Sequence, residues 1–449
     1  MTKNIVIIGA GISGLSLLYF LKKKYAGRSD VRITLLEKND HAGGNIRTQS
    51  EGSAVFECGP NGFLANQPVM LDLISELGLI GELISARAEA KRRYVLIEDQ
   101  LHAFPMNPAQ LFGFRPMRLS QKLRIFLEPF VAKGNDPQES IYGFVKRRFG
   151  HACAKYFADP MVSGIYGGNS EYLNAACAFP KVYEYEQTSG SVIKGMMASK
   201  KKAGGSLKAE LRTFKGGMGT LIKALADACA ESVRLNEPVR EIIHAAPYFL
   251  VVTDQDKYSA DELYIATPAF AAAALLRYFD GDLIRALSAV EYAPIAVVGL
   301  LFEKTAFTNI PDGFGYLIPS SEQKRVLGVL TESNIFEGRA AESQVMLRVM
   351  IGGARHPQCA KMTQEELTEI ALAEIKERYG VTEPPAGRFF INYSKAIPQY
   401  ETQYPMLKKR ILQHLTSIKG LFLLSNYLDG VSSNDCVKNA RAAAHRSNL

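Results

Sequence analysis

Apolar and polar positions along the first forty residues fall into blocks that predict a strand, a helix and a second strand. Residues 3–8 (KNIVII) form a short apolar run, which is typical of a buried parallel strand. The stretch LSLLYFLKKKY (15–25) has the pattern of an amphipathic helix, and VRITLLEK (31–38) predicts the next strand. This order is that of a β-α-β unit.

Three glycines stand between the first strand and the helix with the spacing G-x-G-x-x-G. The first permits a tight turn, the second lets the backbone approach a pyrophosphate, and the third lets the helix pack on the strand. The helix N-terminus offers free N–H groups to phosphates. Glu37, at the end of the second strand, can accept hydrogen bonds from a ribose 2′-OH and would repel the 2′-phosphate of NADP. The pattern predicts a dinucleotide-binding fold, with these residues at the cofactor: Gly9, Ala10, Gly11, Ile12, Ser13, Gly14, Glu37 and Lys38.

Later apolar runs predict further strands of the same domain. They are EPVREI (237–242), ELYIATP (262–268) and LFLLSNYLDGVS (421–432), the last followed by a glycine turn and a helix. The run PIAVVGLLF (294–302) is about half as long as the roughly 18 apolar residues that a membrane-spanning helix needs.

Composition excludes several classes of protein. The 449 residues allow two or three domains, and 47% hydrophobic with 22% charged residues is ordinary for a globular chain. Six scattered cysteines without C-x-x-C argue against a zinc site or a disulfide framework and suit a reducing compartment, so we expect no metal. The net charge of +8 is not pooled in one tail and no nucleic-acid motif accompanies it, so we expect no nucleic-acid partner. AGGS (203–206) predicts a solvated loop.

The choice between NAD and FAD depends on HAGGNIRT (41–48). This segment resembles the G-G-x-x-R/x-T stretch of flavoenzymes of the amine oxidase and porphyrinogen oxidase type, which lies along the rest of the cofactor. The resemblance implies that Gly44 and Asn45 face the cofactor and that Arg47 contacts its diphosphate. It therefore implies FAD.

From ECGPNGFL (57–64) onward the chain resembles the oxygen-dependent protoporphyrinogen oxidases over essentially its whole length. The supporting stretches, in order, are AKRRYVLIEDQLHAFP (90–105), DPMVSGIYGGN (159–169), EYAPIAVVGLLF (291–302), DGFGYLIPSSEQKRVLG (312–328), RVMIGGARHP (348–357), IPQY (397–400) and NYLDGVSSNDCVKNARAAA (426–444). The resemblance places the flavin ring beside Gly59, Pro60, Asn61 and Gly62, its pyrimidine end at Gly430, Val431 and Ser432, and the adenine side near Val239. Cys436 lies beyond the GVS turn, so we expect FAD to be bound non-covalently.

The same resemblance implies a tetrapyrrole substrate in a largely apolar pocket. Arg93 would bind a propionate through its planar guanidinium, and the other pocket positions would be Gly164, Phe314, Gly315, Leu317 and Met350. No catalytic side chain beyond the flavin N5 is implied. Three hydride transfers would give the six-electron oxidation of protoporphyrinogen IX to protoporphyrin IX in haem biosynthesis, with dioxygen as acceptor and hydrogen peroxide as by-product.

The expected fold class is α/β with three domains. A discontinuous Rossmann-like FAD domain takes residues 1–68, 215–268 and 410–449; a mixed-sheet substrate domain takes 69–98, 180–214 and 269–409; and a helical, membrane-binding domain takes 99–179. Within the last, residues 111–133 mix apolar side chains with five cations, and Ser120 is expected to cap a helix that begins at Gln121. We expect a cytoplasmic protein peripherally attached to the membrane; a homodimer and handover of product to a ferrochelatase are further partners that the resemblance leaves open.

Three alternatives remain open from the sequence. The nearest is the oxidation of coproporphyrinogen III to coproporphyrin III, a substrate with four propionates whose pocket should carry extra cations. The others are a different FAD amine oxidase or desaturase, and a flavin- or porphyrin-binding protein without turnover.

Overall fold

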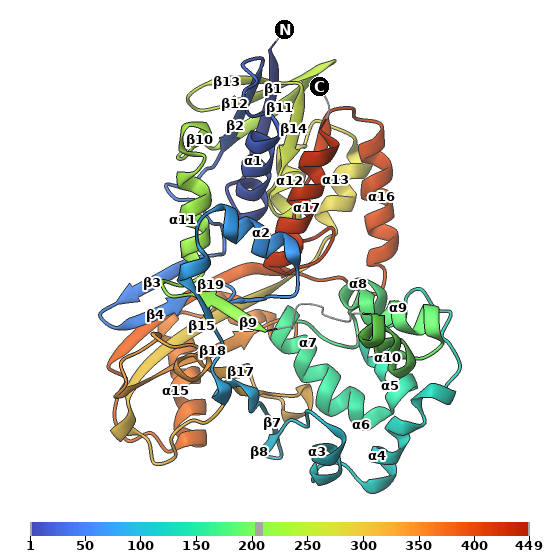
Figure 1. Cartoon of the computed structure of the whole chain (residues 1–449), viewed down its shortest axis with the longest axis vertical. Helices are drawn as coiled ribbons and strands as arrows, with labels where there is room; N and C mark the ends of the chain where they lie inside the picture. Colours follow the sequence, from blue (N-terminus) through green and yellow to red (C-terminus); the bar gives the residue numbers. More distant parts are fainter. Residues whose placement is uncertain (1, 203–209, 448–449) are drawn as a thin grey trace.

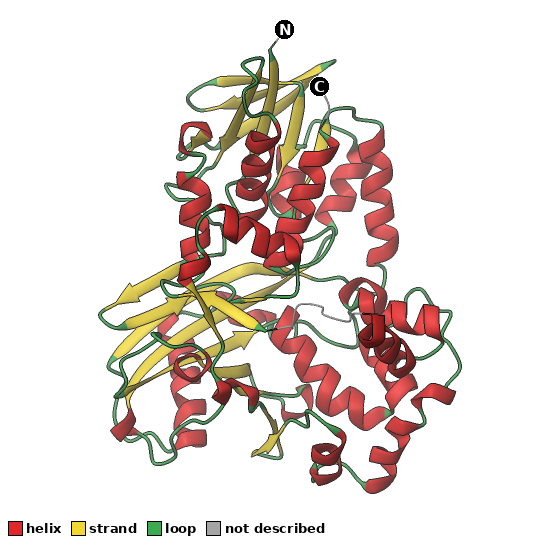
Figure 2. Cartoon of the chain, viewed as in Figure 1, coloured by secondary structure: helices red, strands yellow, loops and turns green. Residues whose placement is uncertain are grey.

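The computed structural model describes residues 2–202 and 210–447, so the predicted loop at 203–206 lies outside the described residues. Figure 1 shows a strand-and-helix region that holds both termini at the top, a larger sheet at the lower left and a cluster of helices at the lower right. Strands lie in the first two regions, whereas the third is helical (Figure 2). The predicted α/β fold class is confirmed.

The upper region is built on a five-stranded parallel sheet in the order β10-β2-β1-β14-β20. Its strands are β1 (Lys3–Ile8), β2 (Val31–Leu36), β10 (Val233–Arg234), β14 (Glu262–Ile265) and β20 (Leu421–Leu423). One face packs on α1 (Ile12–Lys24), α2 (Pro68–Glu76), α11 (Gly219–Asp227) and α17 (Ser433–Arg446). The other face packs on the sheet of β11 (Val239–Ala245), β12 (Tyr248–Thr253) and β13 (Lys257–Ala260), and on α12 (Ala269–Leu275), α13 (Gly281–Ser288) and α16 (Tyr404–Thr416). Burial on both faces explains why β1 and β14 are almost wholly apolar.

The lower-left region is a seven-stranded sheet in the order β19-β15-β18-β17-β16-β7-β8. The strands are β7 (Tyr94–Ile97), β8 (Gln100–Ala103), β15 (Tyr292–Glu303), β16 (Gly315–Leu317), β17 (Val326–Thr331), β18 (Gln344–Gly352) and β19 (Gly387–Pro398). Helix α15 (Gln364–Tyr379) covers one face, where alternate β18 residues such as Leu347 and Val349 are buried. The intervening residues of β18 therefore face the opposite side, toward the upper region.

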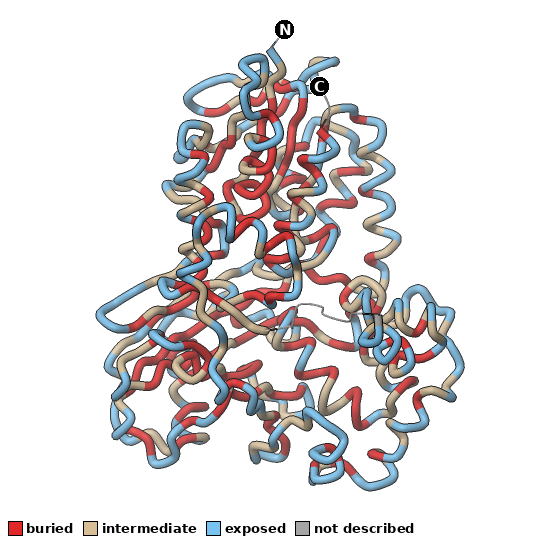
Figure 3. Tube along the Cα trace, viewed as in Figure 1, coloured by how far each residue is buried: buried red, intermediate tan, exposed pale blue. Residues whose placement is uncertain are grey.

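Smaller elements join the two sheets. They are the hairpin β3 (Thr48–Glu51) and β4 (Ala54–Glu57), the three-stranded sheet of β5 (Phe63–Leu64), β9 (Leu211–Phe214) and β6 (Leu83–Ser85), and the short helix α14 (Glu332–Ile335). Figure 3 shows that buried residues follow the strands of both large sheets.

The helical region differs in extent from the predicted residues 99–179. It contains α3 (Pro108–Gly113), α4 (Leu119–Phe126), the short 3-10 turn η3 (Glu128–Phe130), α5 (Ile141–Phe149), α6 (His151–Cys153), the π-helical turn η4 (Ala154–Ala158), α7 (Asp159–Tyr166), α8 (Ala175–Ala178), α9 (Pro180–Ser189) and α10 (Val192–Lys202). Helices α9 and α10 pack within this cluster, although the sequence analysis placed them in the substrate domain. Among the described residues, every helix is too short or too polar to cross a membrane.

One expectation inside this region is wrong. Helix α4 begins at Leu119, two residues before the expected start at Gln121. Ser120 lies within the helix, while the side-chain oxygen of Gln121 accepts a hydrogen bond (2.8 Å) from the backbone N–H of Arg118. Ser120 therefore lies in the first turn of α4 and does not cap it. Gln121, three residues after Arg118, accepts the Arg118 N–H in the manner of a capping box.

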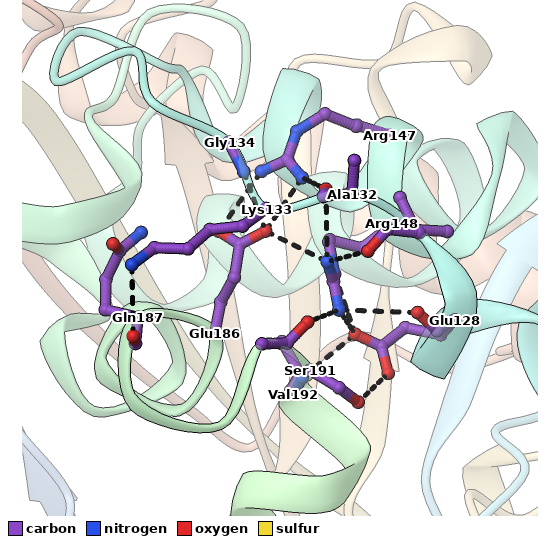
Figure 4. Close-up of polar contacts among 12 residues, drawn as sticks. Glu128, Ala132, Lys133, Gly134, Arg147, Arg148, Glu186, Gln187, Ser191 and Val192 are labelled. Atoms are coloured by element: carbon purple, nitrogen blue, oxygen red, sulfur yellow. Dashed lines mark hydrogen bonds and ion pairs between the residues drawn. The ribbon is translucent and has the colours of Figure 1, made fainter.

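A buried group of charges holds the helical cluster together (Figure 4). The side chains of Arg148, Glu128 and Glu186 are 0% exposed. Arg148 pairs with both carboxylates, and Arg147 pairs with Glu186 at 2.7 Å. Glu128 also accepts hydrogen bonds from the Ser191 hydroxyl and from the first backbone N–H groups of α10, which lower its pKa although burial alone would raise it. Because α5, η3 and α9 contribute the charges and α10 contributes backbone N–H donors, these contacts fix the four segments relative to one another.

We expect Arg148→Met to lower the free energy of unfolding by about 3–5 kcal/mol, because it leaves the buried Glu128 carboxylate without its counter-charge and removes one of the two cations that pair with Glu186. Urea denaturation followed by circular dichroism measures the change. Arg285→Met is the control, since the Arg285–Asp282 pair is largely exposed and its loss should cost less than about 1 kcal/mol. A similar small loss in both variants would contradict the structural role given to Arg148.

Candidate active site

A cleft of about 1720 Å³ runs between the parallel sheet, the seven-stranded sheet and the helical cluster. Pockets for a single small molecule usually measure about 300–1,000 Å³, so this cleft has room for a dinucleotide and a second ligand. Most predicted cofactor residues line it: Gly9, Gly11, Ile12, Ser13, Glu37, Lys38, Gly44, Asn45, Arg47, Gly59, Pro60, Asn61, Gly62, Val239, Val431 and Ser432. The residues that the sequence places at FAD therefore come together.

The glycine turn after β1 has the geometry that a pyrophosphate requires. A Cβ on Gly11 would meet no atom within 4 Å, so the backbone here is open to a ligand. A Cβ on Gly14 would lie 2.0 Å from the Gly9 carbonyl oxygen, which shows how closely α1 packs on the turn. Ala10 is buried behind the cleft, and its N–H donates to Glu37 Oε2 (2.8 Å). The N–H and the side-chain amide of Asn39 donate to Glu37 Oε1, so Glu37 is held in place from both sides and keeps a free lone pair on Oε2 for a ribose.

The segment after β2 continues the same wall. Gly43 and Gly44 have positive φ values of 117° and 58°, which let the chain double back against the first turn, where Gly43 bridges Gly11. Arg47 is exposed and faces the cleft, as expected for a diphosphate ligand.

The turn after β20 closes the far end of the cofactor region. Gly430 lies just behind the lining with φ of 96°, and its N–H donates to the Tyr400 hydroxyl (3.0 Å). That hydroxyl donates in turn to the Asn426 carbonyl. Ser432 caps α17 by accepting the Asp435 N–H (3.1 Å), so a second helix N-terminus opens into the cleft beside Val431. Both helix ends place partial positive charge where an anionic ligand would be stabilised.

The IPQY stretch connects this turn to the helical cluster. While Tyr400 binds the 426–430 turn, the adjacent Gln399 donates from Nε2 to the Tyr166 carbonyl at the end of α7 (2.9 Å). Gln399 and Tyr400, which are neighbours in sequence, thus connect the turn at residues 426–430 to the end of α7.

The remaining wall of the cleft is mainly apolar. Ile295, Val297, Leu327 and Met350 line it from the seven-stranded sheet, and Gly164 lines it from α7. Of the predicted substrate residues, only Gly164 and Met350 belong to the lining.

The other four predicted substrate residues do not belong to the lining. Leu317 packs on Gly164, where an added Cβ would lie 2.8 Å from Leu317 Cδ2. Gly315 is buried with φ of 120° against β17. The Arg93 guanidinium lies 4.5 Å from the centre of the Phe314 ring in a cation–π contact. Arg92, the preceding residue, is paired with Asp312 (2.6 Å).

Sequence reasoning missed several residues of the lining. Arg348 interrupts the apolar strand QVMLRVMIG, and a cation in such a run is the signal that could have found it. Tyr393 has a buried hydroxyl with no partner among the described residues, and burial raises its pKa to about 12.

Burial also raises the pKa of Cys436 to about 11, so this thiol is neutral and a poor nucleophile at neutral pH. Within the described part of the chain, no group of three or more His, Cys, Asp or Glu side chains could hold a metal ion.

We expect Gly11→Ala to fold normally but to bind FAD at least about tenfold more weakly, because its methyl group enters the ligand space. Gly14→Ala should instead destabilise the fold, since its methyl group collides with the Gly9 carbonyl. Thermal unfolding without flavin and fluorescence titration with FAD separate the two effects. Gly81→Ala is the control, because Gly81 also has open space around its Cβ but lies outside the cleft. Wild-type FAD affinity in Gly11→Ala would contradict this placement of the pyrophosphate.

Known proteins with the same features were found by sequence and by structure. Residues 12–446 match the family model of the flavin-containing amine oxidoreductases. The mitochondrial protoporphyrinogen oxidase of Nicotiana tabacum is 29% identical, with 98% of this chain and 94% of the relative covered, and the protoporphyrinogen oxidase of Homo sapiens is 28% identical, with 99% and 98% covered.

Solved structures share the fold. A crystal structure described as a candidate protoporphyrinogen oxidase of Exiguobacterium sp. 255-15 superposes with a TM-score of 0.84 at 21% identity, covering 99% of this chain and 98% of that chain. Reduced UDP-galactopyranose mutase superposes with a TM-score of 0.73 at 15% identity, covering 99% and 93%. With the glycine turn, the second glycine pair and the two helix N-termini in one cleft, these matches identify the cofactor as FAD. The chain belongs to the flavin-containing amine oxidoreductase family and is an FAD-dependent oxidoreductase.

Proposed function

We propose that the protein oxidises protoporphyrinogen IX to protoporphyrin IX. The observation that carries this proposal is the likeness to protoporphyrinogen oxidases over nearly the full length of both chains. The continuity of the predicted cofactor residues with an apolar wall in one cleft supports it, because a tetrapyrrole is a large apolar ligand that must reach the flavin.

FAD, held by the glycine turn after β1, Glu37 and the 59–62 loop, would supply hydride acceptance in three rounds, so that one porphyrinogen and three O₂ would give one porphyrin and three H₂O₂. The chain's own residues orient the macrocycle and exclude water. Ile295, Val297 and Met350 offer an apolar surface to its face, and Gly164 leaves room beside α7. Arg93, which lies outside the lining, would bind a propionate that extends from the cleft, while its own position is held by Phe314.

A second candidate substrate is coproporphyrinogen III. Its four propionates need more cations, and Lys181, Arg277 and Lys395 also line the cleft. The likeness to relatives named for protoporphyrinogen favours the first candidate.

Purified holoenzyme mixed with each porphyrinogen should develop porphyrin fluorescence faster with protoporphyrinogen IX than with coproporphyrinogen III. Arg93→Ala should raise the KM for the preferred substrate about tenfold or more while FAD content stays that of the wild type, because only the propionate contact is lost. A faster reaction with coproporphyrinogen III would favour the second candidate. If porphyrin fluorescence grows with neither substrate, both candidate functions are rejected. Wild-type kinetics in Arg93→Ala would reject the propionate contact.

We also propose that the outer face of α4 and η3 binds the surface of an anionic membrane. Leu119, Leu123, Leu127 and Phe130 are between 49% and 84% exposed along one side of these turns. Of the five cations in residues 111–133, Lys122, Arg124 and Lys133 donate to backbone carbonyls within the fold. The remaining cations, Arg115 and Arg118, are exposed and can meet lipid headgroups, while Glu128 is buried.

Co-sedimentation with liposomes that contain anionic lipid should fall severalfold in the double variant Leu123→Glu/Phe130→Glu, because both apolar contacts become anionic. Tyr278→Glu is the control, since Tyr278 is 68% exposed but lies between α12 and α13. Equal sedimentation of the two variants would reject this surface.

A further inference from the structure

Arg348 is a buried cation among apolar neighbours on the cleft-facing side of β18. Met346 and Met350 flank it on that side, and only 8% of its side chain is exposed. Removing a guanidinium from water costs several kcal/mol unless hydrogen bonds and opposite charge offset the loss. The hydrogen-bond and ion-pair partners of Arg348 therefore indicate its role.

Those partners belong to the loop that the sequence places beside the flavin ring. Arg348 Nη2 donates to the Gly59 carbonyl oxygen at 2.5 Å. Its Nη1 lies 3.6 Å from Glu332 Oε1, and both oxygens of Glu332 accept from Asn61 Nδ2 at 3.3 and 3.4 Å. Arg348 thus holds the loop of residues 59–62 at two points, directly at Gly59 and through Glu332 at Asn61.

A second buried guanidinium, that of Arg339, is 1% exposed; burial lowers its pKa, and the charges of Glu57 and Glu332 act against that shift. Burial raises the pKa of Glu57 to about 7, so its carboxyl loses negative charge as the pH falls below that value. Because Arg348 itself lines the cleft, its positive charge acts on a ligand there.

We propose that Arg348 is a positioning residue for the flavin, which anchors residues 59–62 and favours the reduced, negatively charged ring. A cation beside the ring lowers the free energy of the reduced form relative to the oxidised form, so it raises the reduction potential. The proposal concerns FAD, which the family assignment supplies, and it does not depend on which porphyrinogen is oxidised.

The test measures the flavin rather than the product. In Arg348→Met holoenzyme, the flavin midpoint potential should become more negative, and the Kd for FAD should rise at least about tenfold, as expected for a lost charge-assisted hydrogen bond. Arg378→Met is the matched control. Arg378 is 9% exposed and ion-paired, but it belongs to α15 on the opposite face of the seven-stranded sheet, so its removal should leave both values unchanged.

Arg348→Lys tests the effect of the positive charge separately from that of the hydrogen bonds that anchor residues 59–62. It also tests the proposal if Arg348→Met does not fold. Lysine keeps the charge but lacks the fork that reaches Gly59 and Glu332 together, so the midpoint potential should stay near the wild-type value while the Kd for FAD rises. A wild-type Kd in Arg348→Lys would overturn the anchor. Wild-type flavin properties in Arg348→Met together with a raised KM for the porphyrinogen would also overturn the proposal, because Arg348 would then be a substrate ligand.

Discussion

The parallel direction of β1, β14 and β20 is the constraint on which the site depends. Strands that run the same way end at the same edge, so the turns that follow them must meet there. The glycine turn after Ile8, the turn after Ile265 and the turn after Leu423 come from three distant parts of the sequence, yet they form one continuous wall. The helices that leave two of these turns point their N-termini at the same space, and this preorganises a binding site for an anionic cofactor before any ligand arrives.

The sequence could predict the elements whose determinants are local. Residues 3–8 form a strand with the expected bounds, and the second strand ends at Leu36, directly before Glu37. The cofactor residues were predictable because each depends on a glycine spacing or on the end of a strand. The family and the cofactor were predictable from several such motifs in a fixed order, and the comparisons confirm both.

The substrate side was less predictable because its geometry depends on contacts between distant segments. Leu317 lies behind Gly164, and nothing in the GFGYL stretch indicates which side of β16 meets α7. Arg348 is brought to the 59–62 loop by the pairing of β18 with β15 and β17, more than 280 residues along the chain from its partner Gly59. The start of α4 was misplaced because the Gln121 side chain accepts the Arg118 N–H and closes the helix end without a serine cap.

Gln399 and Tyr400 are consecutive, and their side chains join the turn at residues 426–430 to the end of α7. A displacement of the 426–430 turn reaches the Tyr166 carbonyl through the Tyr400 hydroxyl, the peptide unit and the Gln399 side chain, next to Gly167 on the wall where the second ligand would lie. If a ligand in one half of the cleft displaces this turn, the free energy of filling the other half changes, and by linkage the effect is equal in both directions. Two adjacent residues would then carry the coupling between the two ligands.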